Sequence, residues 1–311
     1  MTPEADTTGP QSGRPARWSG RHPTEAATAY ALAYLLLASG AGLLAAALPS
    51  PAAQAVVVTA AWIATITISL LLVLSLCRIA MRPRTELLWV FATMMVFCLT
   101  RPIVFAFLGR LLGHPAAGKR IAEALSFLPA QELFGNIALI MWAAFLGKLV
   151  SRLIREGKLL LPIILVAALA DIITVYWGPV AHITENAPEV AQALSASAPV
   201  APPPGVAAPI LAAVGIGDFL FLAVFLAAII RHAMEPVKTT WAALALMLVA
   251  PFAFIVAPEG YGIPGLPFLA IAVLWANWRH LRFTLEEKRA LAFAGVLVAA
   301  SAVGIWVLLH R

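Results

Sequence analysis

The sequence predicts an all-α membrane protein, a polytopic bundle of about nine transmembrane helices. Of its 311 residues, 62% are hydrophobic and only 12% are charged, whereas roughly a quarter of the residues of a soluble domain carry charge. The apolar residues are gathered in runs of about 20, the length of a helix that spans a bilayer core. The basic residues stand in short clusters between these runs. That pattern indicates membrane topology and argues against nucleic acid as a partner.

The chain begins with a polar segment that precedes the apolar runs. Residues 1–26 are rich in Pro, Gly, Ser, Thr and Arg, and we expect a disordered tail ahead of a transmembrane domain at 27–311. The sequence at 53–55 is similar to a signal-peptide cleavage site, but the preceding apolar run is longer than a signal peptide's, which favours an uncleaved span. The mixed stretch 110–132 predicts an interfacial helix. The predicted spans are 27–48, 54–77, 87–109, 133–151, 159–178, 206–230, 240–257, 262–278 and 290–309.

The charges of the connecting segments alternate along the chain. Lys and Arg precede the first span and follow the second, fourth, sixth and eighth, whereas segments 49–53, 179–205 and 258–261 contain neither. The positive-inside rule then places the N-terminus in the cytoplasm and the C-terminus outside. Stretch 110–132 departs from the rule, because it falls outside although it contains Arg110, Lys119 and Arg120. The composition favours a bacterial inner membrane.

Two of the three aspartates in the chain, Asp171 and Asp218, lie inside predicted spans. A charged carboxyl group at mid-bilayer costs several kcal/mol, so an intramembrane acid is a functional candidate by default. The two spans run antiparallel and are joined by one segment, and the two depths differ by less than ~10 Å. The carboxyl groups can therefore face each other. One of such a pair holds a proton while the other acts as a base that activates water, which is aspartyl protease chemistry.

The residues around these aspartates form three motifs. Gly215, Gly217 and Asp218 make a GxGD motif, and Gly215-Ile216-Gly217-Asp218-Phe219-Leu220-Phe221 closely resembles the seventh helix of presenilins. The stretch after Asp171 runs through Gly-Pro into a polar segment, as the stretch after the first catalytic aspartate of presenilins does. Pro264-Gly265-Leu266-Pro267 is similar to the Pro-Ala-Leu signature of a late presenilin helix, with glycine in place of alanine.

The resemblance covers about 160–275 and is to the GxGD intramembrane aspartyl proteases, the presenilin and signal peptide peptidase family. It implies the fold of that family, transmembrane proteins in the lipid bilayer as substrates, and neither a metal nor an organic cofactor. It also implies catalysis by Asp171 and Asp218 and motif or substrate-binding roles for Gly215, Gly217, Phe219, Pro264, Gly265, Leu266 and Pro267. Three departures stand out: the aspartates fall on spans five and six rather than six and seven, an extra span follows, and Ala170 replaces a tyrosine.

Other functions of the same residues stay open. A proton-coupled transporter or channel would use the same buried acids as a relay, and a proteolytically silent scaffold would retain the motif. Type IV prepilin peptidases also carry GxGD, but they usually have a lysine soon after it and acids near the cytoplasmic face. Cys77, Cys98 and the six histidines show no metal-ligand spacing. Arg101, within the third span, is expected to snorkel or to form a structural pair.

Overall fold

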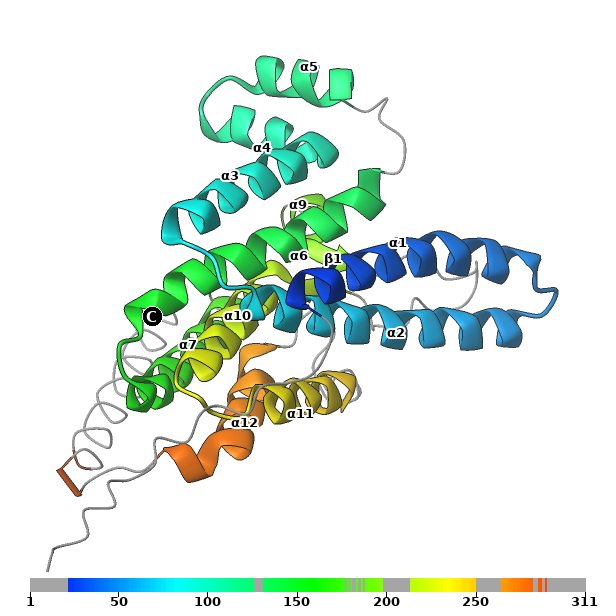
Figure 1. Ribbon diagram of the computed structural model, residues 1–311. Helices are drawn as coiled ribbons and strands as arrows, with labels where there is room; N and C mark the ends of the chain where they lie inside the picture. Colours follow the sequence, from blue (N-terminus) through cyan, green and yellow to red (C-terminus); the bar gives the residue numbers. More distant parts are fainter. Residues whose placement is uncertain are drawn as a thin grey trace, which may run out of the picture.

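The protein is mostly helical in a computed structural model (Figure 1). The structure describes residues 22–125, 131–176, 188–197, 213–249 and 264–281, with isolated residues at 178, 180, 183, 186, 285, 286 and 289. Its α-helices are α1 (Pro23–Ala47), α2 (Pro51–Arg78), α3 (Pro83–Thr100), α4 (Ile103–Leu111), α5 (Pro115–Leu125), α6 (Gln131–Val150), α7 (Leu160–Tyr176), α9 (Pro188–Ala193), α10 (Ile216–Arg231), α11 (Pro236–Val249) and α12 (Leu266–Asn277). Its 3-10 turns are Ser151–Leu153, Gly157–Leu159 and Trp278–His280, and its strands are β1 (Ser195–Ser197) and β2 (Ala213–Gly215).

Four of the described helical segments are long and apolar enough to cross a bilayer: Pro23–Ala45, Ala52–Arg78, Leu133–Leu153 and Gly157–Tyr176. The predicted third span, 87–109, is broken, because α3 and α4 meet at a bend of 96°. Counting that pair as one span gives five. The predicted span 290–309 lies outside the described residues, and those at 206–230, 240–257 and 262–278 are described in part. A total of about nine spans therefore stays a prediction.

Helix starts follow local sequence signals. Proline stands in the first turn of α1, α2, α3 and α12, where its missing N–H costs no hydrogen bond and its fixed φ suits a helix. Ser50 caps α2 by accepting a hydrogen bond from the Ala53 N–H at 3.1 Å. The first helix begins at Pro23, a few residues before the predicted start of the first span.

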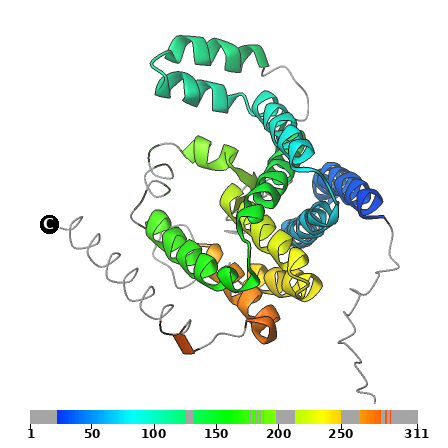
Figure 2. The same ribbon diagram turned by 60° about the vertical axis from the view of Figure 1, so that its left-hand side comes forward.

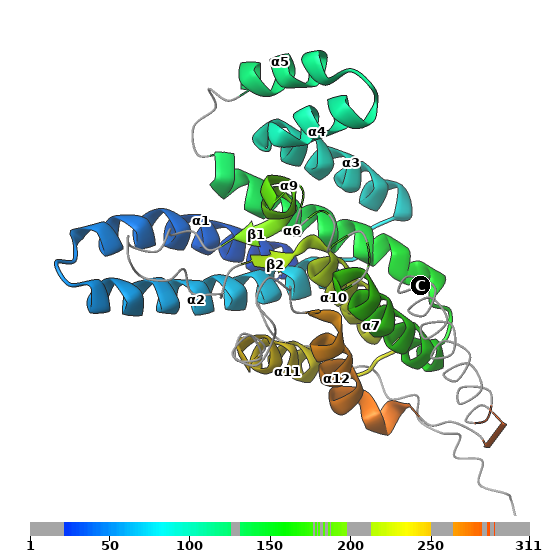
Figure 3. The same cartoon turned by 180° about the vertical axis from the view of Figure 1, so that it is seen from behind.

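Helix α10 is the centre of the core. Every residue from Leu222 to Ile229 is buried, and α10 packs on α6 and α2 (Figures 1 and 3). The approach of α6 is close at Gly147, where an added Cβ would contact the Leu220 carbonyl oxygen and lie 2.7 Å from Ala223 Cβ. Around this centre α1 lies on α2, α3 lies on α6, and α12 contacts both α11 and α7.

The segment between the two aspartate helices is more structured than the predicted loop 179–205. Part of it forms α9 and β1, and β1 pairs with β2 in an antiparallel ladder that places Ser195 opposite Gly215. The ladder continues with a hydrogen bond from the Ile216 N–H to the Leu194 carbonyl at 3.1 Å. The predicted Pro-rich tract 199–205 lies outside the described residues. A two-stranded sheet thus leads directly into α10 (Figure 3).

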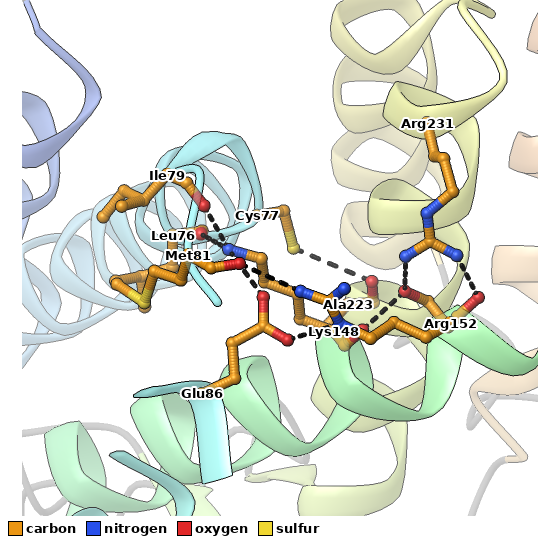
Figure 4. Close-up of polar contacts among 10 residues, drawn as sticks. Leu76, Cys77, Ile79, Met81, Glu86, Lys148, Arg152, Ala223 and Arg231 are labelled. Atoms are coloured by element: carbon orange, nitrogen blue, oxygen red, sulfur yellow. Dashed lines mark hydrogen bonds and ion pairs between the residues drawn. The ribbon is translucent and has the colours of Figure 1, made fainter. Parts of the chain in front are cut away.

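A buried ion network joins the ends of α2, α3, α6 and α10 (Figure 4). Glu86, whose side chain is 0% exposed, lies 2.7 Å from Arg152 Nε and 3.4 Å from Lys148 Nζ. Lys148 also donates to the carbonyls of Leu76, at 3.3 Å, and Ile79. The sequence pattern indicated simple loop charges here, whereas Glu86 and Lys148 are buried.

Helix dipoles explain why the cations of this network outnumber its one carboxylate. The C-terminal ends of α2, α6 and α10 meet near this network, and each carries a partial negative charge from its free carbonyls. Arg231, the last residue of α10, donates to the Ser151 carbonyl at 2.6 Å and to its hydroxyl at 3.0 Å. The network therefore fixes the end of α10 against the end of α6.

Candidate active site

Asp171 and Asp218 lie near corresponding ends of two antiparallel helices. Asp171 lies five residues before the end of α7 at Tyr176, and Asp218 is in the first turn of α10. The sequence had placed Asp218 deep inside a span at 206–230. The helix starts later than that span, because residues 213–215 form β2 and α10 begins at Ile216. The depth of Asp218 in the membrane stays a prediction. Both side chains are half-buried.

The start of α12 lies against both aspartates. The Leu266 N–H donates to Asp171 Oδ2 at 2.9 Å. Pro264 and Pro267 have no N–H, so Gly265 and Leu266 carry the only backbone donors of this four-residue segment. A carboxylate at a helix N-terminus is stabilised by these donors and by the helix dipole.

Gly265 also contacts Asp218, on its other side. A Cβ added to Gly265 would meet Asp218 Oδ1 and lie 2.7 Å from Cγ and 2.8 Å from Oδ2. The backbone of Gly265 has φ −83° and ψ −31°, which any residue adopts. Glycine is thus required here by space and not by conformation. The methyl of the alanine that stands in the presenilin signature would lie where the Asp218 carboxyl is.

The GxGD motif forms the start of α10. Asp218 is the third residue of α10 and lies in its first turn, where the free N–H groups and the helix dipole favour a carboxylate. A Cβ on Gly215 would lie 3.6 Å from Asp218 Oδ2, an ordinary contact, and a Cβ on Gly217 would meet no atom within 4 Å. Gly217 is exposed and therefore leaves open space beside Asp218.

The two aspartates meet through α12 rather than through direct packing of their own helices. Helix α7 packs mainly on α12, and α10 packs mainly on α6 (Figures 1 and 3). The sequence allowed direct packing of the two spans, whereas the start of α12 links the two aspartates in the structure. Both carboxyl groups contact the Gly265–Leu266 backbone, one at each of these two residues. Two carboxyls in this arrangement can divide the roles of base and acid.

The remaining motif residues serve the fold in this structure. The side chain of Phe219 is 2% exposed and that of Leu266 is 5% exposed, and both belong to the main core. Pro264 is buried as well. For Leu266, the backbone N–H reaches the site while the side chain holds α12 in place. Within the described ranges, no three side chains of His, Cys, Asp and Glu come together as in a metal site.

Sequence reasoning missed one part of this region, the β1–β2 pair. Ser195-Ala196-Ser197 and Ala213-Val214-Gly215 are too short and too rich in small residues to show a strand pattern. The available signal was Gly215 itself, because a glycine before a helix is also compatible with a strand end. In the described part of the chain these two strands pair only with each other, so each has an unpaired edge.

No family model, no curated protein and no solved structure matches this chain.

Proposed function

We propose that this protein is an intramembrane aspartyl endopeptidase of the presenilin and signal peptide peptidase type, which cleaves transmembrane segments of other proteins. One observation carries the proposal. The Pro264–Pro267 segment contacts both Asp171, through the Leu266 N–H, and Asp218, through Gly265. Three motifs that lie far apart in the sequence thus meet at one place, and that place contains two carboxyl groups.

The chemistry follows from the two carboxyls. One of them, as carboxylate, takes a proton from a water molecule whose oxygen attacks the carbonyl carbon of the scissile peptide bond. The other donates its proton to the carbonyl oxygen. When the tetrahedral intermediate collapses, the C–N bond breaks and the leaving nitrogen takes a proton from the carboxyl that acted as base. Asp171 suits the role of base, because the Leu266 N–H at the start of α12 donates to its carboxyl group and favours the carboxylate.

A substrate must present an extended backbone to these groups, because the carbonyls of an intact helix are already hydrogen-bonded. The free edge of β2 supports such binding. It ends at Gly215, three residues before Asp218, and in the described part of the chain β2 pairs only with β1. An extended segment added to this edge would satisfy its own backbone groups. It would pass beside Gly217, where the open space lies.

The orientation that we propose for the protein in the membrane follows from its basic clusters. By the positive-inside rule, the connection between α7 and α10 lies outside and the N-terminus lies in the cytoplasm. This is the orientation of signal peptide peptidases, opposite to that of presenilins. Preferred substrates should therefore cross the membrane in the direction opposite to presenilin substrates. The bacterial inner membrane is the proposed location.

A cleavage assay tests the proposal. Purified protein in liposomes is incubated with a transmembrane peptide, with and without an aspartyl-protease transition-state inhibitor. Inhibitor-sensitive cleavage is expected. A transporter would show no cleavage and would instead move protons across the liposome membrane when its cargo is supplied, and a silent scaffold would do neither.

A further inference from the structure

Helix α3 ends at a sharp bend that fixes the direction of the chain after it. Its 18 residues extend about 27 Å, close to the thickness of a bilayer core. Its outer face is apolar and exposed, as expected of a surface in contact with lipid; it includes Leu88, Phe91, Met95 and Leu99. The chain then turns by 96° into α4. A helix perpendicular to a membrane-crossing helix lies along the membrane surface.

The bend is held in place by buried polar contacts. Arg101, at the end of α3, is 8% exposed, and its Nη2 donates to Asn136 Oδ1 at 2.5 Å. Gly135 makes room for this guanidinium, because a Cβ there would lie 2.6 Å from Arg101 Nε. After the bend, Val104 packs against a small core cluster that contains Phe97. The direction of α4 is therefore built into the fold.

Helix α5 folds back on α4 to form a hairpin, which lies at the top of Figures 1 and 2. The two helices almost touch at a pair of glycines. A Cβ on Gly109 would lie 2.7 Å from Gly118 Cα, and one on Gly118 would lie 2.9 Å from Gly109 Cα. Gly113 makes the turn with φ +75°, a conformation that favours glycine. On its other side, α4 contacts α9, which leads to β1.

The surface of this hairpin is both basic and apolar. Arg110, His114, Lys119 and Arg120 are exposed near the turn, and one acid, Glu123, lies 3.9 Å from Lys119. Exposed Leu108, Leu112 and Ile121 lie beside them. Basic residues next to apolar side chains at a membrane surface suit the boundary between lipid phosphates and acyl chains. These basic residues depart from the positive-inside rule. An anionic partner on the outer side of the membrane would explain why they lie there.

We propose that the α4–α5 hairpin lies flat on the outer membrane surface and binds the phosphates of anionic lipid headgroups through Arg110, Lys119 and Arg120. The inference does not depend on proteolysis. Leu108 and Leu112 of the hairpin are exposed, as the apolar outer face of α3 is. A hairpin seated on the membrane also supports α9 and, through it, the approach to β1.

Spin-label accessibility in the full-length protein tests the proposal. A nitroxide is placed at Leu112→Cys, and a control label at Glu156→Cys, an exposed position between α6 and α7, in a chain with Cys77 and Cys98 replaced by alanine. The vesicles contain phosphatidylcholine alone or with phosphatidylglycerol. The collision frequency of the Leu112 label with a water-soluble nickel chelate should be several-fold lower than that of the Glu156 label. Phosphatidylglycerol should lower its accessibility further.

Charge removal tests the phosphate contacts. The variant Arg110→Gln/Lys119→Gln/Arg120→Gln should lose the effect of phosphatidylglycerol, and high salt should remove it from the unsubstituted hairpin by screening. The salt experiment decides the question even if the triple variant fails to fold. Equal accessibility of the two labels would overturn the proposal and favour a hairpin that binds a water-soluble protein. If the Leu112 label is protected but its accessibility changes with neither phosphatidylglycerol nor salt, the proposed phosphate contacts are overturned.

Discussion

The backbone N–H of Leu266 donates to the Asp171 carboxyl at 2.9 Å, although the two residues are 95 positions apart. This hydrogen bond joins the start of α12 to the C-terminal part of α7 and brings a proline-flanked segment to Asp171. On the other side of the same segment, Gly265 lies against Asp218.

Alanine at position 265 should impair cleavage. Its methyl would overlap the Asp218 carboxyl and turn it away from its partner. We expect Gly265→Ala to lower kcat at least about tenfold, or about 1.4 kcal/mol, with little change in KM. The substitution restores the Pro-Ala-Leu sequence of presenilins, so a simple reading of the family resemblance predicts the opposite.

Gly215→Ala is the matched control, because its methyl would lie at an ordinary 3.6 Å from the same carboxyl. It should retain most of the activity. Steady-state cleavage of a transmembrane peptide by both variants checks the prediction. Equal rates for Gly265→Ala and the wild type would show that this close contact does not position Asp218.

Loss of the buried carboxylate Glu86 should destabilise the helix bundle. Glu86→Gln leaves Lys148 and Arg152 without their anion, and removing one partner of a buried ion pair costs about 3 kcal/mol when a partner is partly exposed. Thermal unfolding in detergent should show a markedly lower Tm. Glu156→Gln removes an exposed carboxylate and should leave Tm unchanged. A Glu86→Gln protein as stable as the wild type would mean that the network contributes nothing to the fold.

Packing between α6 and α10 should tolerate no added methyl at Gly147. A Cβ there would contact the Leu220 carbonyl and lie 2.7 Å from Ala223 Cβ, and overpacking a core costs about 1–3 kcal/mol. Gly42→Ala adds the same methyl to α1, where it meets no atom within 4 Å. Thermal unfolding should therefore separate the two variants, with Gly147→Ala less stable and Gly42→Ala no worse than the wild type. An unchanged Tm for Gly147→Ala would mean that these helices can move apart freely.

The orientation of the protein can be read with an impermeant thiol reagent. Cysteine at Asn186, an exposed residue between α7 and α10, should label in intact cells. Cysteine at Glu156, on the other side of α7, should label only after the cells are permeabilised. Labelling of Asn186→Cys only after permeabilisation would reverse the topology and give the protein the orientation of presenilins.

Much of the helical layout follows from the sequence, because apolar length and helix-starting prolines are local signals. The starts of α2 and α3 follow the prolines at 51 and 83, and α6 and α7 fall close to their predicted spans. The bend after α3 was missed, since it depends on Arg101 reaching Asn136, a contact between distant residues. The burial of Lys148 and its pairing with Glu86 were missed for the same reason. From sequence alone, a lysine near the end of a span is interpreted as a charge of the connecting loop.

The candidate site was predictable in its residues but not in its geometry. Rare intramembrane aspartates and the motif around each identify Asp171 and Asp218 from sequence alone. Their meeting through the start of α12 could not be predicted, because loop positions far apart in sequence are set by tertiary packing. Nor does the sequence show that Gly265 faces Asp218, so closely that an added methyl group would overlap the carboxyl.

The central claim is that Asp171 and Asp218 act as one catalytic unit, and asparagine substitution tests it most directly. Asp171→Asn, Asp218→Asn and the double variant keep the size of each side chain but remove its acid-base function, and loss of a buried ionisable group should not lower stability much. Cleavage of a transmembrane peptide is measured for all three, and for the wild type across pH, where a bell-shaped profile should belong to the pair. Each single variant should be inactive, and the double variant should be no worse than either, because the pair acts as a unit. Near-normal cleavage by either single variant would contradict it.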